Sequence, residues 1–253
     1  MKSLELRLNV PLFRRSPRGL LLTDEGQALL PVLRDSFDRM SAAISRFEGG
    51  IFREVLTVSA VGTFAVGWLL PRLKGFADAH PHVDLRLLTN NNKVDLWTES
   101  LDFAIRFGDG AWHGTHAELL LNAPLAPLCK PETAARLSQP GDLLGETLLR
   151  SYRAEDWPNW FASAGVEVSA VGGPVFDSSW TMAEAAMRGA GVALAPPSMF
   201  QRELVEGRLA QPFEQEISAG SYWLTWLKSR ELTSAMDAFR SWITAQAEEA
   251  EAE

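Results

Sequence analysis

Hydroxyl-bearing side chains follow two apolar segments, at the point where each segment gives way to a helix-like pattern. Gly62 and Thr63 come directly after the run EVLTVSAV, and VFDSSWTM places Asp177, Ser178 and Ser179 in the same way. The first turn of a helix carries unpaired backbone N–H groups and a partial positive charge, which suit a carboxylate or a phosphate. Because ligands of open α/β sheets lie at the carboxyl ends of strands, the two helix starts are candidate walls of a ligand cleft. Ordinary helix capping, which Asp177 favours, is the alternative.

A polar loop is a further candidate for the cleft. The segment TNNNKVD (residues 89–95) follows an apolar, strand-like run and offers side-chain amides, Lys93 and Asp95. A plain surface turn would have the same composition.

Catalytic and metal chemistry find little support in the sequence. It contains no nucleophile-elbow, P-loop or dinucleotide-binding motif. The single cysteine, Cys129, is interpreted as a small core residue. The four histidines, in HPH (80, 82) and HGTH (113, 116), lack zinc-type spacing with a clear third ligand. We therefore expect no catalytic residues, no metal and no cofactor, and a protein that is not an enzyme.

Charge separates the first twenty residues from the rest of the chain. They hold five Lys or Arg and one Glu, a net charge of +4, whereas the 253-residue chain carries −8. One basic end on an acidic body favours contact between that end and a polyanion, and a solvated tail is the alternative. Two short strand-like runs flank the turn SPRG, which forms the tip of a predicted hairpin. We expect arginines there to contact DNA phosphates: Arg14, Arg15 and Arg18.

A long amphipathic helix is predicted over residues 23–48. Thr23 is a good N-cap, acidic residues fill the first turn, Pro31 predicts a kink, and Gly49 ends the pattern. Apolar residues recur every three or four positions, as in a coiled-coil seam. We expect this seam to mediate dimerisation, and packing of the helix on its own body is the alternative. Its residues are Leu30, Leu33, Phe37, Met40, Ile44 and Phe47.

The remaining residues alternate strand-like and helix-like segments. Strand-like runs over 54–61, 82–89 and 101–108 are separated by amphipathic segments such as 62–81, and the pattern continues to a final helix near 231–247. Such alternation predicts an α/β fold with a mostly parallel sheet. The sequence has no membrane-spanning run and no recognisable secretion signal, and its single cysteine fits a reducing compartment, so we expect a cytoplasmic protein.

The order and spacing of these motifs resemble those of LysR-type transcriptional regulators. LFRRSPRGLLLTDEGQALLPVL is similar to the wing and linker helix of that family, and VGTFAVG, NNNKVD, VFDSSWTM, GVALAP and GSYWLT are similar to segments of its effector-binding domain. The resemblance covers about residues 2–242. It implies a winged-helix remnant (1–22), a linker and dimerisation helix (23–50), and an effector-binding domain (51–247) similar to periplasmic binding proteins. Its two subdomains would comprise about 51–125 with 225–247, and about 126–224.

The resemblance also implies a function. It indicates a homodimeric or homotetrameric regulator of β-lactamase expression that binds promoter DNA and senses muropeptides from cell-wall recycling. A UDP-linked muramyl pentapeptide would favour repression, and anhydro-muramyl peptides would favour activation. Matching positions place Thr63, Ser179 and Tyr222 in the effector pocket, with Gly62 and Asp95 near the cleft. The alternatives are a LysR-type regulator with another small-molecule effector and a solute-binding protein of transport type.

Two features depart from the family pattern. The base-reading helix of the family precedes a segment like KSLE, which here begins at Lys2, so we expect this chain alone to bind DNA weakly and without sequence preference. Trp180 and Trp226 stand where the family is expected to carry smaller or charged residues, which bears on the shape of the pocket.

Overall fold

The computed structural model describes residues 2–16, 19–45, 53–90, 95–96, 99–168 and 170–252. The chain divides into two compact units, Met1–Val55 and Leu56–Glu253. Among the helices formed by these residues, none is long and apolar enough to cross a membrane.

The first unit consists of a short helix, a β-hairpin and a long helix. Phe13 pairs with Leu22 and Arg14 with Leu21, so the predicted hairpin is confirmed, and its predicted turn at Pro17 and Arg18 lies outside the described residues. The elements are α1 (Lys2–Leu8), β1 (Phe13–Ser16), β2 (Gly19–Leu22) and α2 (Asp24–Ser45).

Thr23 caps α2, as predicted. Its Oγ1 accepts a hydrogen bond from the Gly26 amide (3.1 Å) and donates one to the Pro11 carbonyl (2.7 Å), which ties the helix start to the strand entry. A Cβ atom on Gly26 would lie 2.2 Å from the Leu12 carbonyl oxygen, so only glycine permits this close approach.

The described part of the α2 seam is exposed. Pro31 lies inside the helix, as its position in the sequence indicated. The side chain of Ile44 and the whole of Phe47 lie outside the described residues. The exposed apolar side chains are Leu30 (42%), Leu33 (37%), Phe37 (63%) and Met40 (58%).

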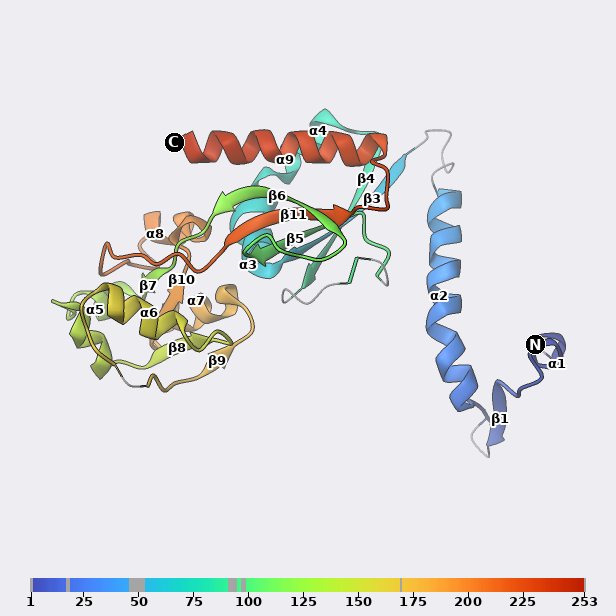
Figure 1. Ribbon diagram of the computed structural model, residues 1–253, viewed down its shortest axis with the longest axis horizontal. Helices are drawn as coiled ribbons and strands as arrows, with labels where there is room; N and C mark the ends of the chain where they lie inside the picture. Colours follow the sequence, from blue (N-terminus) through green and yellow to red (C-terminus); the bar gives the residue numbers. More distant parts are fainter. Residues whose placement is uncertain are drawn as a thin grey trace. The chain divides into compact units, whose positions relative to one another are not determined.

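A five-stranded mixed sheet organises one part of the second unit (Figure 1). Its order is β4-β3-β5-β11-β6, in which β3 and β5 are parallel while β11 is antiparallel to both β5 and β6. The strands are β3 (Glu54–Val61), β4 (Val83–Asn90), β5 (Phe103–Gly108), β6 (Thr115–Asn122) and β11 (Ser221–Leu227).

Two helices cover this sheet, α4 (Leu73–Ala79) and the long α9 (Ser234–Ala252) (Figure 1). Phe76 of α4 meets Phe239 of α9 edge-on at 5.3 Å, and Phe239 lies 5.9 Å from Phe103 of β5. All three rings are buried, so an aromatic cluster joins the helices to the sheet.

The helical segment predicted over residues 62–81 is interrupted. It runs as α3 (Gly62–Phe64), a π-helical turn (Ala65–Leu69), a 3-10 turn (Leu70–Arg72) and α4. Pro71 has no N–H to continue the α-helical ladder, which accounts for the change of winding. A Cβ atom on Gly67 would lie 2.1 Å from the carbonyl oxygen of Met199, so glycine permits the close packing of the π turn on the 3-10 turn at Pro197–Met199.

A second, four-stranded sheet has the order β7-β10-β8-β9. Here β10 is antiparallel to β7 and parallel to β8, and β8 is parallel to β9. Both sheets are therefore mixed. The prediction of a mostly parallel sheet holds for the four-stranded sheet, in which two of the three strand pairs are parallel. It did not foresee that β11 runs antiparallel to both of its neighbours in the five-stranded sheet. The strands are β7 (Ala126–Leu128), β8 (Leu148–Ser151), β9 (Val175–Phe176) and β10 (Val192–Ala195); the helices beside them are α5 (Pro131–Ala134), α6 (Asp156–Ser163), α7 (Ser179–Met187) and α8 (Gln201–Val205).

One proposed subdomain boundary needs to move. A boundary at residues 224–225 would cut through β11, which belongs entirely to the five-stranded sheet. A boundary before Ser221 keeps the strand intact, and the assignment of two subdomains remains a proposal.

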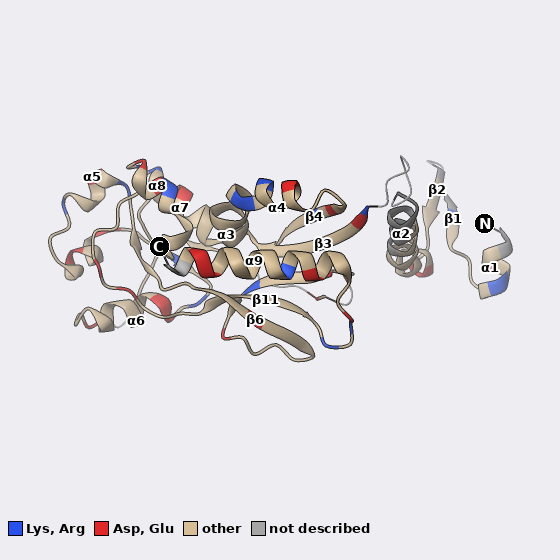
Figure 2. Cartoon of the chain, turned by 90° about the horizontal axis from the view of Figure 1, so that it is seen from above, with Lys and Arg blue, Asp and Glu red and all other residues tan. Residues whose placement is uncertain are grey.

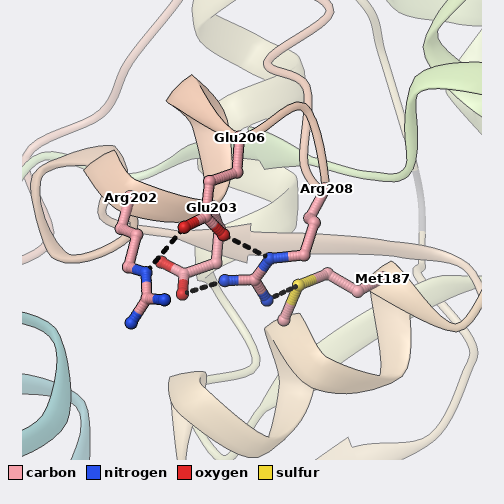
Figure 3. Close-up of polar contacts among 5 residues, drawn as sticks. All are labelled: Met187, Arg202, Glu203, Glu206 and Arg208. Atoms are coloured by element: carbon pink, nitrogen blue, oxygen red, sulfur yellow. Dashed lines mark hydrogen bonds and ion pairs between the residues drawn. The ribbon is translucent and has the colours of Figure 1, made fainter.

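Charges of both signs are interspersed along α4, α8 and α9 (Figure 2). Near α8 they form a network in which Arg208 donates to the buried Glu203 carboxylate (2.7 Å) and to Glu206 (2.9 Å), while Arg202 also donates to Glu206 (2.8 Å) (Figure 3). Arg208 further donates to the Met187 sulfur (3.3 Å), so the network fastens α8 to the end of α7.

A buried carboxylate joins three distant parts of the second unit. Asp102, just before β5, accepts a hydrogen bond from the Thr57 amide of β3 (2.7 Å) and forms an ion pair with Arg230. Arg230 follows β11 and also donates to the Leu101 carbonyl (3.2 Å). Asp102 is 7% exposed, so water cannot replace these partners.

Replacing Asp102 with alanine should destabilise the second unit by about 2–4 kcal/mol, because the Thr57 amide loses its acceptor and Arg230 loses its ion-pair partner. Asp84→Ala is the matched control, since Asp84 forms a half-exposed ion pair with Arg86 at 3.7 Å and such pairs contribute less than about 1 kcal/mol. Urea unfolding measures both variants, and equal losses would show that the Asp102 cluster adds no more than a surface pair.

Candidate functional site

A cavity of about 460 Å³ lies in the second unit and brings distant segments together. Of the six residues predicted to bind an effector, five line it: Gly62, Thr63, Ser178, Ser179 and Tyr222. The other lining residues are Val61, Asn90, Phe107, Leu125, Ser151, Tyr152, Arg153, Phe176, Asp177 and Pro196. The lining is drawn from both sheets and from the helix starts that follow their strands.

One hydrogen bond joins the two predicted helix starts. The Oγ1 of Thr63, in the first turn of α3, accepts from the backbone N–H of Trp180 in the first turn of α7 (3.1 Å). Thr63 is buried (6% exposed), so this bond is shielded from solvent. The threonine thus caps a helix that lies 117 residues further along the chain.

The serines at the start of α7 retain hydrogen-bonding capacity toward the cavity. Ser178 occupies the N-cap position in an extended conformation, but its side chain makes no capping hydrogen bond. Among the described residues, the hydroxyls of Ser178 and Ser179 have no hydrogen-bond partner. The capping alternative is therefore wrong for these two side chains, since Thr63 supplies the cap instead.

Tyr222 presents a buried phenol to the same cavity. It lies on β11 with 2% exposure, and its ring packs against Phe64 (5.0 Å) and edge-on against Phe107 (5.2 Å). Burial raises the pKa of the Tyr222 hydroxyl well above its usual range, although nearby Arg153 opposes the shift. Within the described chain, no group hydrogen-bonds to this hydroxyl. The Tyr222 hydroxyl is therefore a neutral O–H donor in the wall of the cavity.

A charged cluster of three residues was missed by sequence reasoning. The Asp156 carboxylate accepts hydrogen bonds from the Ser151 hydroxyl (2.8 Å) and from Arg153 Nε (3.1 Å), and Ser151 Oγ accepts from the Arg153 amide (3.0 Å). The guanidinium of Arg153 also lies over the Phe107 ring, 4.5 Å from its centroid. The available signal was the polar run SYRAED directly after an apolar, strand-like segment.

The structure does not bring Asp95 to the cavity. Asp95 is exposed, and its amide donates to the Glu99 carboxylate (3.2 Å). Lys93 of the same polar loop lies outside the described residues. Of the predicted DNA contacts, Arg14 is exposed on β1, whereas Arg18 and the side chain of Arg15 lie outside the described residues.

The two tryptophans that depart from the family pattern are not among the lining residues. The ring of Trp180 stacks on Phe200 at 5.3 Å, and Trp226 is buried against Phe103 and His116.

Burial raises the pKa of the Cys129 thiol to about 11, which disfavours thiolate chemistry at neutral pH. In the part of the chain that the structure describes, no group of three or more His, Cys, Asp or Glu side chains could hold a metal ion.

Comparison with known proteins matches most of this chain to one protein family. The sequence pattern of the LysR substrate binding domain family matches residues 50–248. The chain is 60% identical to the HTH-type transcriptional activator AmpR of Pseudomonas aeruginosa over 96% of its own length and 83% of the relative. It is 58% identical to AmpR of Citrobacter koseri, over 98% of its own length and 86% of the relative.

Solved structures agree with the sequence comparison. The effector domain of AmpR from Pseudomonas aeruginosa superposes with a TM-score of 0.76 at 58% identity, covering 79% of this chain and 98% of that one. A Citrobacter freundii effector binding domain with three substitutions superposes with a TM-score of 0.75 at 45% identity, covering 77% of this chain and all of that one. Its substitutions are threonine to valine, serine to alanine and tyrosine to phenylalanine.

Thr63→Val should lower the free energy of unfolding by about 1 kcal/mol, because the Trp180 amide loses its acceptor at the start of α7. Thr63→Ser keeps the hydroxyl and should lose less. Urea unfolding of both variants checks the expectation, which fails if valine is tolerated as well as serine.

Proposed function

This chain belongs to the LysR family of transcriptional regulators, and we propose that it controls β-lactamase expression in response to cell-wall muropeptides bound in the cavity between its two sheets. The convergence of the Thr63, Ser179 and Tyr222 hydroxyls on one cavity carries this proposal. The regulatory role is supported by the relatives, which include a carbapenem-hydrolyzing β-lactamase transcriptional activator of Serratia marcescens, 48% identical over 96% of the chain.

The chemistry of the cavity suits a muropeptide. Such a ligand carries several carboxylates and amides, which need many hydrogen-bond donors. The walls offer free serine hydroxyls, a buried phenol and the first turn of the nine-residue helix α7. These groups donate without adding negative charge, which matters in a chain of net charge −8.

The substituted Citrobacter freundii domain gives independent support. Its three substitutions each remove one hydroxyl, from a threonine, a serine and a tyrosine. The same three residue types meet in this cavity as Thr63, Ser179 and Tyr222. We infer that these three hydroxyls bind the effector.

Dimerisation through α2 is the second part of the proposal. The apolar side chains of the described seam are exposed, although they recur with coiled-coil spacing. A second copy of the helix would bury them, so the regulator would act as a homodimer or a homotetramer. The basic hairpin before α2 carries Arg14 and would contact phosphates of promoter DNA.

Deleting single cavity hydroxyls should weaken effector binding. Ser179→Ala and Tyr222→Phe should each raise the Kd for a UDP-muramyl pentapeptide or an anhydro-muramyl tripeptide about ten- to a hundredfold, because each removes a hydrogen bond to a charged or polar ligand group. Isothermal titration calorimetry on the full chain measures the change. Stability should be unaffected, since neither hydroxyl has a hydrogen-bond partner among the described residues.

Ser36→Ala is the matched control for these variants. Ser36 lies on α2, and its hydroxyl donates only to the Val32 carbonyl of the same helix (2.8 Å), so its loss should leave the Kd unchanged. If the unaltered chain binds neither muropeptide at millimolar concentration, the muropeptide assignment fails, and a LysR-type regulator with another effector remains. If a ligand binds but both cavity variants bind it equally well, the site has been placed wrongly.

Charged residues in the α2 seam should dissociate the dimer. Leu33→Glu combined with Met40→Glu places like charges at the helix contact, so sedimentation should detect monomers where the unaltered chain is dimeric. Val32→Glu, at an exposed position beside the seam, is the control and should stay dimeric. A dimer that persists in the double variant at low micromolar concentration would show that other surfaces hold the copies together.

A further inference from the structure

Arg153 has the surroundings of a ligand-binding cation rather than of a surface salt bridge. Its side chain is 42% exposed, yet it is held on two sides. One edge donates through Nε to Asp156 (3.1 Å), and one face lies over the Phe107 ring at 4.5 Å. The guanidinium therefore has a defined orientation before any ligand binds.

The opposite edge of this guanidinium remains available. Nε makes the one hydrogen bond that the structure describes for the side chain, so the terminal Nη groups have no hydrogen-bond acceptor among the described residues. Planar N–H groups of this kind bind a carboxylate through two parallel hydrogen bonds. Asp177 is the other charged residue in the described lining, and it would repel a carboxylate.

Asp156 serves to position Arg153. Its carboxylate is 11% exposed and is held by the Ser151 hydroxyl (2.8 Å), which itself accepts from the Arg153 amide. Removing Ser151 or Asp156 would free the guanidinium to rotate away from the cavity.

Tyr222 provides a second donor at the same place. It is 2% exposed, lines the cavity, and packs edge-on against Phe107, the same ring over which the Arg153 guanidinium lies. Its hydroxyl has no partner among the described residues. A cation and a buried phenol therefore both contact Phe107, and both line the cavity.

We propose that Arg153 binds one carboxylate of the effector through its Nη edge, with the Tyr222 hydroxyl donating to the same group. This inference rests on the proposed muropeptide function and identifies the residue that recognises the anionic part of the ligand. It separates two tasks within the cavity, since the helix-start hydroxyls bind the polar backbone of the peptide while Arg153 selects for a carboxylate.

Charge-neutral and charge-conserving variants test the assignment. Arg153→Gln should raise the Kd for the anhydro-muramyl tripeptide about ten- to a hundredfold, and Arg153→Lys should fall in between because it keeps the charge without the planar pair of donors. Arg150→Gln is the matched control: Arg150 lies on the same strand β8, donates to the Gly173 carbonyl (2.9 and 3.0 Å), and does not line the cavity. It should change the Kd less than about twofold, and thermal unfolding checks that all three variants are folded.

A set of amidated ligands identifies the carboxylate. Calorimetry compares the tripeptide with derivatives that carry one carboxamide in place of each carboxylate in turn. One derivative should bind the unaltered chain about tenfold or more weakly, yet should bind Arg153→Gln as well as the parent tripeptide does.

The outcomes separate the two proposals. If the unaltered chain does not bind the tripeptide or the UDP-linked pentapeptide, the proposed function fails. If it binds and Arg153→Gln binds equally well, the muropeptide assignment stands and the role of Arg153 is refuted. If each amidated derivative binds more weakly than the parent tripeptide by the same factor in the unaltered chain and in Arg153→Gln, the carboxylate is recognised elsewhere in the cavity. The role of Arg153 is then again refuted.

Discussion

The cavity depends on the hydrogen bond from the Trp180 amide to Thr63 Oγ1. A helix is normally capped by the side chain of the residue just before it, and that side chain is then not available to hydrogen-bond to a ligand. Here Ser178 holds that position with its hydroxyl unused, because Thr63 of α3, the helix that follows β3 of the other sheet, supplies the acceptor. The bond fixes the distance between two helix starts and leaves the serine hydroxyls for a ligand. Local capping and ligand binding compete for the same groups, and the fold resolves that competition with one residue from a distant part of the chain.

Charge balance imposes the second constraint. The chain is acidic, and the anionic ligand that we propose would have to enter a cavity that also contains Asp177. An unpaired arginine would attract any anion, but Asp156 partly neutralises Arg153 and holds its orientation. Attraction is then confined to the free edge of the guanidinium, where the distance and angle of a carboxylate matter most. Under this proposal, selectivity for a carboxylate would come from the geometry of that free edge.

The parts of the fold that the sequence predicts are those that local chemistry determines. Thr23 starts α2 because a threonine hydroxyl caps its own helix, and the β1–β2 hairpin follows from two short strand-like runs around a proline and a glycine. The mixed direction of the sheets follows from no such pattern. β11 returns from late in the chain and lies between β5 and β6, antiparallel to both. The alternation of apolar residues is the same whichever way a neighbouring strand runs, so periodicity alone could not show it.

The residues of the site also differ in how far the sequence alone could identify them. Thr63 and Ser179 stand at helix starts, where the backbone itself creates a binding chemistry, so their residue types and positions were informative. Tyr222 is a strand aromatic like many others, and only its likeness to a known family singled it out. Arg153 had only a weak signal, the polar run SYRAED after a strand-like segment. Its proposed role depends on Phe107 from the other sheet and on Asp156 of the helix that follows it. The residues that a sequence reveals are therefore those of the general hydrogen-bonding walls, whereas the side chain that we propose selects the ligand has surroundings that exist only in the folded protein.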